Sequence, residues 1–470
     1  MTEASSTQFP PRGDAEDPGA THAAVSTNGE SAVAVTVESE PAVEFAPPTT
    51  AEQYAPLAPA SPEETGLSQT LVADLALKLL YQRGPMTATD LSGALCLPLG
   101  RILQPVLDFL KAEHQLEVKG GTGLTSSSFY YSLATKGIDR AKEALARNGY
   151  IGPAPVPLAA YTNRVRAQTT GDLHIGIEQL RKALGALVLP ERTIRQLGPA
   201  INSGRSIFLF GPPGTGKSTI AKTLSTILKG SIVVPYAILV DDQIIRVYDP
   251  SRHKPLVALD ARFDRRWVPV TRPFVEVGGE LTLEDLDLAF DPSSQVHQAP
   301  FQMKANGGVL LIDDFGRQRA SPEELLNRWI VPLDRDVDFL TTNDGRKIEV
   351  PFDLLLVFAT NRTPSSLVDE AFLRRIQYKI EIRPPSPPEF AEILRRVCEA
   401  RNIAFYPQAA DWIAQYCTQR NIPLRSCHPR DLMGHLDAAA RFLGKPSEIT
   451  PELVELACET YFVRLEDKPA

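Results

Sequence analysis

The chain has 470 residues, of which 43% are hydrophobic and 23% are charged. A chain of this length is too long for one hydrophobic core and predicts roughly two to four domains. Its apolar content is that of a soluble globular protein, and it has no run of about eighteen apolar residues that would predict a membrane span. The N-terminus lacks the basic-then-apolar pattern of a signal peptide, so we expect a cytoplasmic protein without membrane insertion. The five cysteines, which lack metal-ligand spacing and are expected to be reduced and structural, are Cys96, Cys398, Cys417, Cys427 and Cys458.

The net charge of −8 is concentrated at the N-terminus. Residues 1–62 hold nine acidic residues and one basic residue, which sum to −8, so the remainder of the chain is neutral overall. A neutral remainder lacks the basic bias that accompanies nucleic-acid binding.

The first part of the chain predicts a tail followed by a small domain. Residues 1–65 are rich in Ala, Pro, Ser, Thr and Glu without a sustained apolar period, which predicts a disordered acidic tail. Residues 66–150 contain three helical patterns, a predicted hairpin from residues 116–119 and 129–133, and a closing helix. This order resembles a winged helix, which often reads DNA through its third helix. Nine basic and seven acidic residues leave a charge of only +2, so protein docking or a structural role is favoured over DNA binding.

Two further domains are predicted after a linker. Residues 151–170 begin with a Pro-rich stretch that predicts a stiff linker. A nucleotide-binding domain is predicted for residues 171–384, and a smaller helical unit with helical apolar spacing for residues 385–466.

Residues 211–218 read Gly-Pro-Pro-Gly-Thr-Gly-Lys-Ser, a complete phosphate-binding loop. The loop lies between an apolar run, residues 206–210, that predicts a buried strand and a segment that predicts a helix, which is the context that the motif requires. Its glycines let successive N–H groups face one concavity, at the positive end of the helix dipole. Lys217 is expected to reach the outer phosphates of ATP, and the Ser218 hydroxyl to ligand Mg²⁺. The predicted nucleotide-binding residues are Gly211, Pro212, Pro213, Gly214, Thr215, Gly216, Lys217, Ser218 and Thr219.

Polar side chains end two more predicted strands. An acidic pair, Asp313 and Asp314, follows the apolar run 309–312, and charged groups at the carboxyl ends of parallel strands face the ligand crevice. Asp313 would hold the magnesium ion together with Ser218, and Asp314 would act as general base toward the attacking water. Asn361 follows the run 354–359 and could donate to the γ-phosphate or orient the water. Ordinary turn residues are the alternative, since Asp and Asn both favour turns.

These motifs, together with residues 369–375, resemble an AAA+ ATPase over about residues 171–465. The resemblance implies a hexameric ring with each nucleotide between two subunits. It makes Arg374 or Arg375 the arginine finger on the neighbour's γ-phosphate. It also makes Arg430 a contact to the γ-phosphate within the same subunit. Solvated surface arginines are the alternative for the pair, and a helix-capping salt bridge is the alternative for Arg430.

The fold class that follows is α/β: a P-loop AAA+ parallel sheet flanked by helices, with a C-terminal helical lid and the winged-helix-like domain. Residues 341–350, with a tight turn at 343–345, predict a hairpin that resembles the insertion grouping MoxR-type and related AAA+ proteins. Residues 184–189 would supply an apolar adenine pocket, by position alone.

The chain departs from the family pattern at Asp314 and lacks two segments that some members have. Asp314 stands where the family has glutamate, and its shorter side chain could hold the base too far from the water for fast hydrolysis. No aromatic–apolar–Gly pore loop is present, so substrate contacts are expected within residues 235–304, where core packing is favoured for Trp267 and for Phe301. The Gly-Ala-Phe-Thr-Gly-Ala segment of bacterial enhancer-binding activators is also missing.

The predicted function is ATP hydrolysis, with ATP and Mg²⁺ bound, by a homo-oligomeric ring that remodels a protein complex. The sequence does not identify the protein client. A DNA-associated ATPase that uses residues 66–150 and a slow nucleotide-gated switch are the alternatives.

Overall fold

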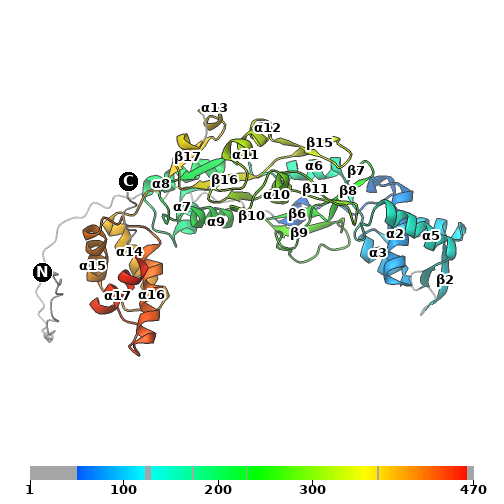
Figure 1. Cartoon of the computed structure of the whole chain (residues 1–470). Coiled ribbons are helices and arrows are strands. Elements are labelled where there is room, and N and C mark those ends of the chain that lie inside the picture. The colour runs from blue at the N-terminus through cyan, green and yellow to red at the C-terminus, as the bar shows by residue number, and fades with distance from the viewer. Residues whose placement is uncertain (1–49, 122–128, 172–173, 229, 368–369, 463–470) are drawn as a thin grey trace, which may run out of the picture.

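The computed structural model describes residues 50–121, 129–171, 174–228, 230–367 and 370–462. Some predictions concern residues outside these ranges: the tail up to residue 49, the turn of the predicted hairpin, Asp369 and the last residues of the lid. The described part is elongated, with the first helices at one end, sheets in the middle and the C-terminal helices at the other end (Figure 1).

A five-stranded parallel sheet, in the order β10-β13-β16-β5-β17, forms the nucleotide-binding domain. Its strands are β5 (Ile207–Phe210), β10 (Phe274–Val277), β13 (Val309–Ile312), β16 (Leu355–Thr360) and β17 (Tyr378–Glu381). The three strands that the apolar runs predict, β5, β13 and β16, are confirmed as adjacent members of this sheet. The P-loop AAA+ α/β fold is therefore confirmed.

Helices cover both faces of the parallel sheet. One face packs against α7 (Ile177–Leu184), α8 (Glu191–Asn202) and α9 (Lys217–Ile227) in a shared hydrophobic core. The other face packs against α10 (Phe301–Ala305) and α11 (Pro322–Arg328), with the buried Trp329 just before α12 (Ile330–Arg335). Side chains of β5 alternate between the two cores, which explains why its run is continuously apolar.

A second sheet, which the sequence did not predict, takes four of its five strands from residues 235–304. Its order is β11-β12-β8-β7-β4, and a separate two-stranded ribbon pairs β6 with β9. The bounds are β4 (Val156–Pro157), β6 (Ser231–Pro235), β7 (Ala237–Val240), β8 (Gln243–Arg246), β9 (Trp267–Thr271), β11 (Ala289–Asp291) and β12 (Val296–Gln298), with a 3-10 turn η4 (Glu284–Leu286). Trp267 is buried in the core beneath this ribbon, and Phe301 packs at the edge of the parallel-sheet core, so core packing is confirmed for both.

The N-terminal unit contains the predicted helices and hairpin. Strand β1 joins the antiparallel pair β2 and β3 in a three-stranded sheet. Its elements are α2 (Gln69–Arg83), β1 (Met86–Thr87), α3 (Ala88–Leu95), η2 (Leu99–Leu103), α4 (Gln104–Ala112), β2 (Leu116–Gly121), β3 (Phe129–Leu133) and α5 (Thr135–Arg147). One hydrophobic core joins this unit, through Tyr150 and Ala154, to Ile244 and Val296 of the second sheet.

The structure differs from the sequence prediction at two boundaries. Residues 50–65, assigned to the tail, form α1 (Ala51–Tyr54) and the 3-10 turn η1 (Glu63–Thr65), and Ala51 N–H donates to Ser231 Oγ over 2.6 Å. The predicted linker instead contributes β4 and α6 (Leu158–Ala167), whose residues Tyr161 and Val165 are buried.

Arg266 joins these two segments to the residues that lead into β9. Its guanidinium is buried in an ion pair with Asp264 and donates to the carbonyl oxygens of Thr65, at 2.9 Å, and Pro155, at 3.2 Å. The segments that composition assigns to a tail and a linker are therefore fastened to one buried cation.

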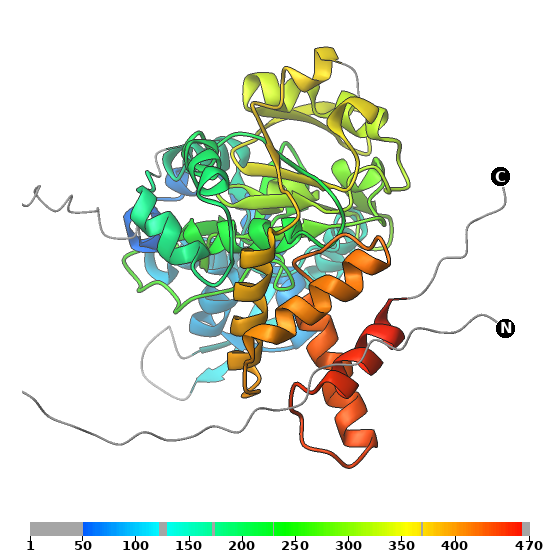
Figure 2. The same ribbon diagram turned by 90° about the vertical axis from the view of Figure 1, so that its left-hand side faces the viewer.

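The predicted hairpin and the C-terminal helical unit are both present. Strands β14 (Val337–Thr341) and β15 (Lys347–Pro351) pair antiparallel, and Gly345 takes a positive φ of +81° in their turn. The C-terminal helices, orange to red in Figure 2, extend from one side of the parallel sheet. They are α14 (Pro387–Ala400), α15 (Pro407–Gln419), α16 (His428–Phe442) and α17 (Pro451–Tyr461), preceded by η5 (Pro364–Ser366) and α13 (Glu370–Leu373).

Among the described residues, no single helix has both the length and the apolarity needed to cross a membrane. Only a pair of helical segments, residues 88–95 and 99–112, meets that requirement jointly, and a bend of 101° separates them. All five cysteines are free thiols.

Candidate nucleotide-binding site

The phosphate-binding loop connects β5 to α9 with three glycines in conformations that other residues disfavour. Gly211, Gly214 and Gly216 have φ values of +140°, +75° and +92°. A Cβ atom on Gly211 would lie 2.2 Å from the carbonyl oxygen of Ile382, and one on Gly214 would lie 2.6 Å from Cys427 Sγ. The glycines therefore serve both the curl of the loop and the close approach of β17 and the lid.

Lys217 begins α9 and is folded back onto the loop. Its side chain is only 7% exposed, and its ammonium donates to the carbonyls of Gly211 (3.0 Å) and Pro212 (2.8 Å) and to Asn361 Oδ1 (2.7 Å). Burial lowers the pKa of Lys217, while the carboxylates of Asp313 and Asp314 act in the opposite direction. A phosphate oxygen placed here would replace these neutral acceptors with a charged one.

The predicted metal ligands lie side by side. Ser218 Oγ donates to Asp313 Oδ1 over 2.9 Å, and the same oxygen accepts from the N–H of Asp314 at 3.0 Å. One hydroxyl and one carboxylate suit Mg²⁺, which prefers oxygen ligands and keeps several waters. The described residues contain no cluster of three or more His, Cys, Asp or Glu side chains that would form an all-protein metal cage.

Asp314 and Asn361 connect the acidic pair to the lysine. Asp314 has a left-handed backbone, with φ of +48°, which aspartate tolerates better than most residues. Its Oδ1 accepts from Asn361 Nδ2 over 3.1 Å, and Asn361 Oδ1 accepts from Lys217. The side-chain amide thus links the predicted general base to the predicted phosphate ligand.

All of these groups open onto one cavity of about 540 Å³ between the loop and the C-terminal helices. Leu187 to Leu189, in the segment predicted as an adenine pocket, line the cavity together with Ile393 and Val397 of α14 and supply its apolar part. The lid touches the loop directly, because the N–H of Cys427 donates to the Gly214 carbonyl at 3.1 Å. The predicted site residues that line the cavity are Pro213, Gly214, Thr215, Gly216, Lys217, Ser218, Thr219, Asp313, Asp314, Asn361 and Arg430, whereas Gly211 and Pro212 do not line it.

The lid supplies cavity residues that sequence reasoning missed. Arg396 on α14 lines the cavity and donates to the carbonyl of Gly185, and Ser426 and Cys427 precede α16. None of these residues belongs to a motif, so the sequence carries no signal for them beyond the helical spacing of α14.

Arg430 lies in the first turn of α16, at the rim of the cavity. Its side chain is 70% exposed, and its Nε donates to Asp431 Oδ1 over 2.9 Å, an interaction that raises the pKa of Arg430. A salt bridge is therefore present, but it joins adjacent residues within α16 and does not cap the helix, and the guanidinium also borders the nucleotide cavity.

Arg374 and Arg375 do not line this cavity. Arg374 is 78% exposed with its Nη2 3.6 Å from Glu370, and Arg375 Nε lies 3.1 Å from Asp334 Oδ2. Both line a different cavity together with Arg205. Neither arginine is among the residues that line the nucleotide cavity of this chain.

A phosphate-binding loop, an acidic pair and a polar strand end at the carboxyl edge of one parallel sheet define a P-loop nucleotide-binding protein. Residues 207–384 match the family described as "ATPase family associated with various cellular activities (AAA)", so the chain contains an AAA ATPase domain. Residues 386–460, which comprise most of the lid, match a domain of unknown function (DUF8689).

Solved structures of AAA+ proteins are among those similar to the chain. The Holliday junction branch migration motor RuvB of Thermotoga maritima is 18% identical over 61% of this chain and 70% of that chain, with a TM-score of 0.32. NtrX from Brucella abortus, solved in complex with ADP, is 14% identical over 71% of this chain and 60% of that chain, with a TM-score of 0.35. The search of curated proteins gave no significant match.

Proposed function

We propose that this protein binds ATP with Mg²⁺ and hydrolyses it as a homo-oligomeric AAA+ ring, in the form of a hexamer, that remodels a protein complex. The observation that supports hydrolysis best is the hydrogen-bonded chain from Lys217 through Asn361 to Asp314. It places a cation, an orienting amide and a carboxylate from three different elements around one cavity. The AAA domain match supports the same class of enzyme.

The groups of the site divide the reaction between them. The loop N–H groups and Lys217 bind the phosphates, and Mg²⁺, which Ser218 and Asp313 would hold, neutralises phosphate charge when bound. Asn361 holds the Asp314 carboxylate toward the nucleotide cavity. A water attacks the γ-phosphorus and gives its proton to Asp314, while the bond to the β-phosphate oxygen breaks and ADP leaves.

The arginines extend the proposal to the ring. Arg374 or Arg375 would approach the γ-phosphate of a neighbouring copy, because neither group reaches the cavity of its own subunit. Arg430 would contact the γ-phosphate in its own subunit once the lid closes, exchanging Asp431 for a phosphate oxygen.

We also propose that the N-terminal unit is a winged helix that docks a protein rather than DNA. Exposed side chains of its third helix α4 include Asp108, Phe109 and Lys111, a mixture without the positive face that phosphate contacts require. The hairpin β14–β15 supports placement in the MoxR-type or a related clade.

Asp314→Asn tests the catalytic part of the proposal. The variant should bind ATP normally and hydrolyse it at least about 100-fold more slowly, because the amide cannot accept the proton. Asp314→Glu should hydrolyse faster than the unmodified protein if the short side chain limits the rate. Phosphate release and ATP binding, measured separately, check both, with Glu323→Gln on the exposed surface of α11 as the control.

The same variant identifies the client. Protein recovered with Asp314→Asn only in the presence of ATP supports remodelling, whereas nuclease-sensitive DNA contradicts it and favours a DNA-associated ATPase. An unmodified protein that binds ATP without measurable hydrolysis would favour the nucleotide-gated switch.

Replacing both Arg374 and Arg375 with alanine tests the shared site. Hydrolysis should fall by about 10³-fold or more with ATP binding retained, because an arginine finger is worth that much in rate. Mixing this variant with Lys217→Ala should restore activity, since some interfaces then combine an intact lysine with intact arginines. Arg383→Ala, which removes an exposed partner of Glu381, is the control. Unchanged hydrolysis in the double variant contradicts a shared site.

A further inference from the structure

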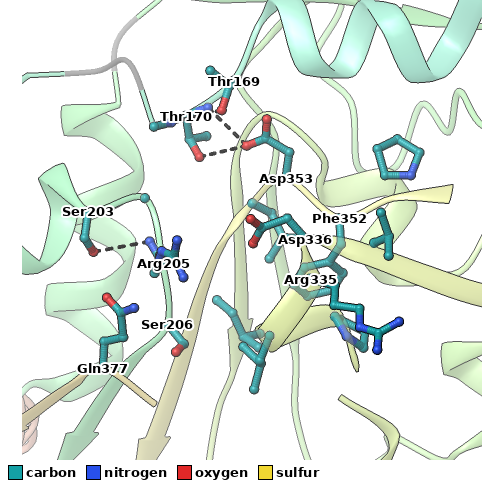
Figure 3. Close-up of a pocket in the computed structure, with 18 of the residues that line it drawn as sticks. Thr169, Thr170, Ser203, Arg205, Ser206, Arg335, Asp336, Phe352, Asp353 and Gln377 are labelled. Atoms are coloured by element: carbon teal, nitrogen blue, oxygen red, sulfur yellow. Dashed lines mark hydrogen bonds between the residues drawn. The ribbon is translucent and has the colours of Figure 1, made fainter. Parts of the chain in front are cut away.

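A second cavity, of about 320 Å³ (Figure 3), is lined by residues at the amino-terminal edge of the parallel sheet and by no residue of the phosphate loop. It is formed by the segments that lead into β5, β16 and β17, by the end of α6, and by the connection from α12 to β14. Arg205 and Gln377 lie on one side of it in Figure 3, and Arg335 and Asp336 lie on the other. None of its lining residues lines the nucleotide cavity.

The rim of this cavity is positively charged. Four arginines and two aspartates line it, which gives a charge of +2: Arg166, Arg205, Arg335, Arg375, Asp336 and Asp353. Throughout the described ranges, no carboxylate lies within ion-pair distance of Arg166, Arg205 or Arg335. Asp353 is already engaged, since its Oδ1 accepts from the N–H and the hydroxyl of Thr170 at 3.2 and 3.1 Å. Unpaired guanidinium groups around a cavity suit a ligand with several carboxylates, which they bind bidentately.

The floor of the cavity is apolar. Phe352, Leu354 and Leu356 line it and are each buried. A suitable ligand therefore combines acidic groups with apolar groups at short spacing, as an extended peptide does when its side chains alternate.

We propose that this cavity binds a carboxylate-rich extended peptide, and that the occupant is the acidic segment at residues 38–45 of the same chain. That segment reads Glu-Ser-Glu-Pro-Ala-Val-Glu-Phe, so three carboxylates lie close in sequence to four apolar residues. Residues 1–49 as a whole hold eight acidic residues and one basic residue, a charge of −7, while residues after 62 are neutral overall.

The attachment point of this segment lies close to the cavity. Burial lowers the pKa of Arg272, and the neighbouring Tyr54 in α1 opposes that shift, which places Tyr54 against this arginine. Arg272 Nη1 in turn donates to the carbonyl of Gln168 at 3.1 Å, and Gln168 precedes Thr169, which lines the cavity. The stretch from Phe45 to Thr50, the residue before α1, can span about 17 Å when extended. Tethering also raises the local concentration of the segment to about the millimolar range.

Occupancy of the cavity would affect the surface that carries Arg374 and Arg375, and this consequence rests on the proposed function. Arg375 and Arg205 line both this cavity and the adjoining one that contains Arg374. A bound acidic segment would therefore compete with the phosphates of a neighbouring copy and restrain ring assembly.

A binding assay tests the inference without reference to ATP. The probe is a fluorescent peptide of residues 36–49, and the protein is the full chain with Glu38, Glu40 and Glu44 replaced by glutamine. The peptide should bind this variant at least about tenfold more tightly than it binds the unmodified chain, whose own segment competes. Adding Arg166→Gln and Arg335→Gln should weaken peptide binding about tenfold or more, and raised salt should weaken it as well.

Matched controls and contrary outcomes are available. Arg262→Gln with Arg346→Gln removes two exposed arginines that already pair with acids elsewhere, and should leave peptide binding unchanged. Equal thermal unfolding midpoints would show that the cavity variants are folded. Equal peptide binding by the neutralised and unmodified chains would overturn the inference. Binding of inorganic pyrophosphate but not of the peptide would also overturn it, in favour of a small phosphate ligand. Because the assay measures peptide binding, a negative result would contradict this inference without bearing on whether the protein hydrolyses ATP.

Discussion

Replacing Lys217 with alanine should reduce ATP hydrolysis by at least about 100-fold and weaken ATP binding strongly. The change removes the charge that meets the outer phosphates, and it leaves the Asn361 amide and the Gly211 and Pro212 carbonyls without their donor. Calorimetric titration with ATP and Mg²⁺, with phosphate release measured in parallel, separates the loss of binding from the loss of turnover.

Lys222→Ala is the matched control, because Lys222 lies on the same helix but is 52% exposed, with its Nζ 3.1 Å from Glu276 Oε2. It should change hydrolysis by less than about twofold, as expected for a surface ion pair. If Lys217→Ala and Lys222→Ala bind ATP equally well, the assignment of the cavity as the nucleotide site is wrong.

The second large effect concerns stability: Asp264→Ala should destabilise the protein by about 3–5 kcal/mol. Asp264 and Arg266 form an ion pair in which each side chain is only 4% exposed, so removing the carboxylate leaves a buried guanidinium without its counter-ion. The same guanidinium donates to the carbonyls of Thr65 and Pro155. Residues 50–65 and the segment around Pro155 should therefore both lose protection from hydrogen exchange. The midpoint of thermal or urea unfolding measures the loss, and hydrogen exchange at residues 50–65 reports the loosening.

Asp260→Ala offers the control for this change. Asp260 pairs with Arg262 at 2.9 Å, but both side chains are more than half exposed, so the loss should stay within about 0.5 kcal/mol. Similar losses for the two variants would show that burial of the Arg266 pair contributes nothing.

The sequence predicted the three central strands of the parallel sheet, β13, β16 and β5, because these strands are buried on both faces. Continuous apolar runs such as the one in β13 are typical of strands inside a parallel sheet, and the runs in β13 and β16 each lead into a polar residue of the site. For this reason Asp313, Asp314 and Asn361 could be placed near Lys217 from one-dimensional order alone. The left-handed backbone of Asp314 and its hydrogen bond with Asn361 could not be predicted from the sequence, because both depend on how the ends of β13 and β16 meet in space.

The second sheet escaped prediction because its strands are short and pair over long distances in the chain. Strand β4 has two residues and pairs with β7, some eighty residues later. A strand this short has no alternating apolar pattern from which it could be predicted. Composition likewise marked residues 50–65 as tail, since Pro and Ala dominate there. Their order comes from distant backbone partners, such as the bond from the Ala58 N–H to the Arg262 carbonyl. The contribution of Cys427 to the phosphate loop is hidden for the same reason.

The hydrophobic core that runs from α2 through Tyr150 to the second sheet has a mechanical meaning. A domain joined to the rest of the chain by a flexible linker would follow its movements only loosely, and thermal motion would randomise its orientation relative to the nucleotide-binding domain. In this protein the shared core, together with the hydrogen bonds from Arg266 to the carbonyls of Thr65 and Pro155, holds the N-terminal unit in a fixed orientation. A tilt of the second sheet would therefore rotate the N-terminal unit as one rigid body. The resulting displacement would increase with distance from the axis of rotation and would be large at the far end of α5.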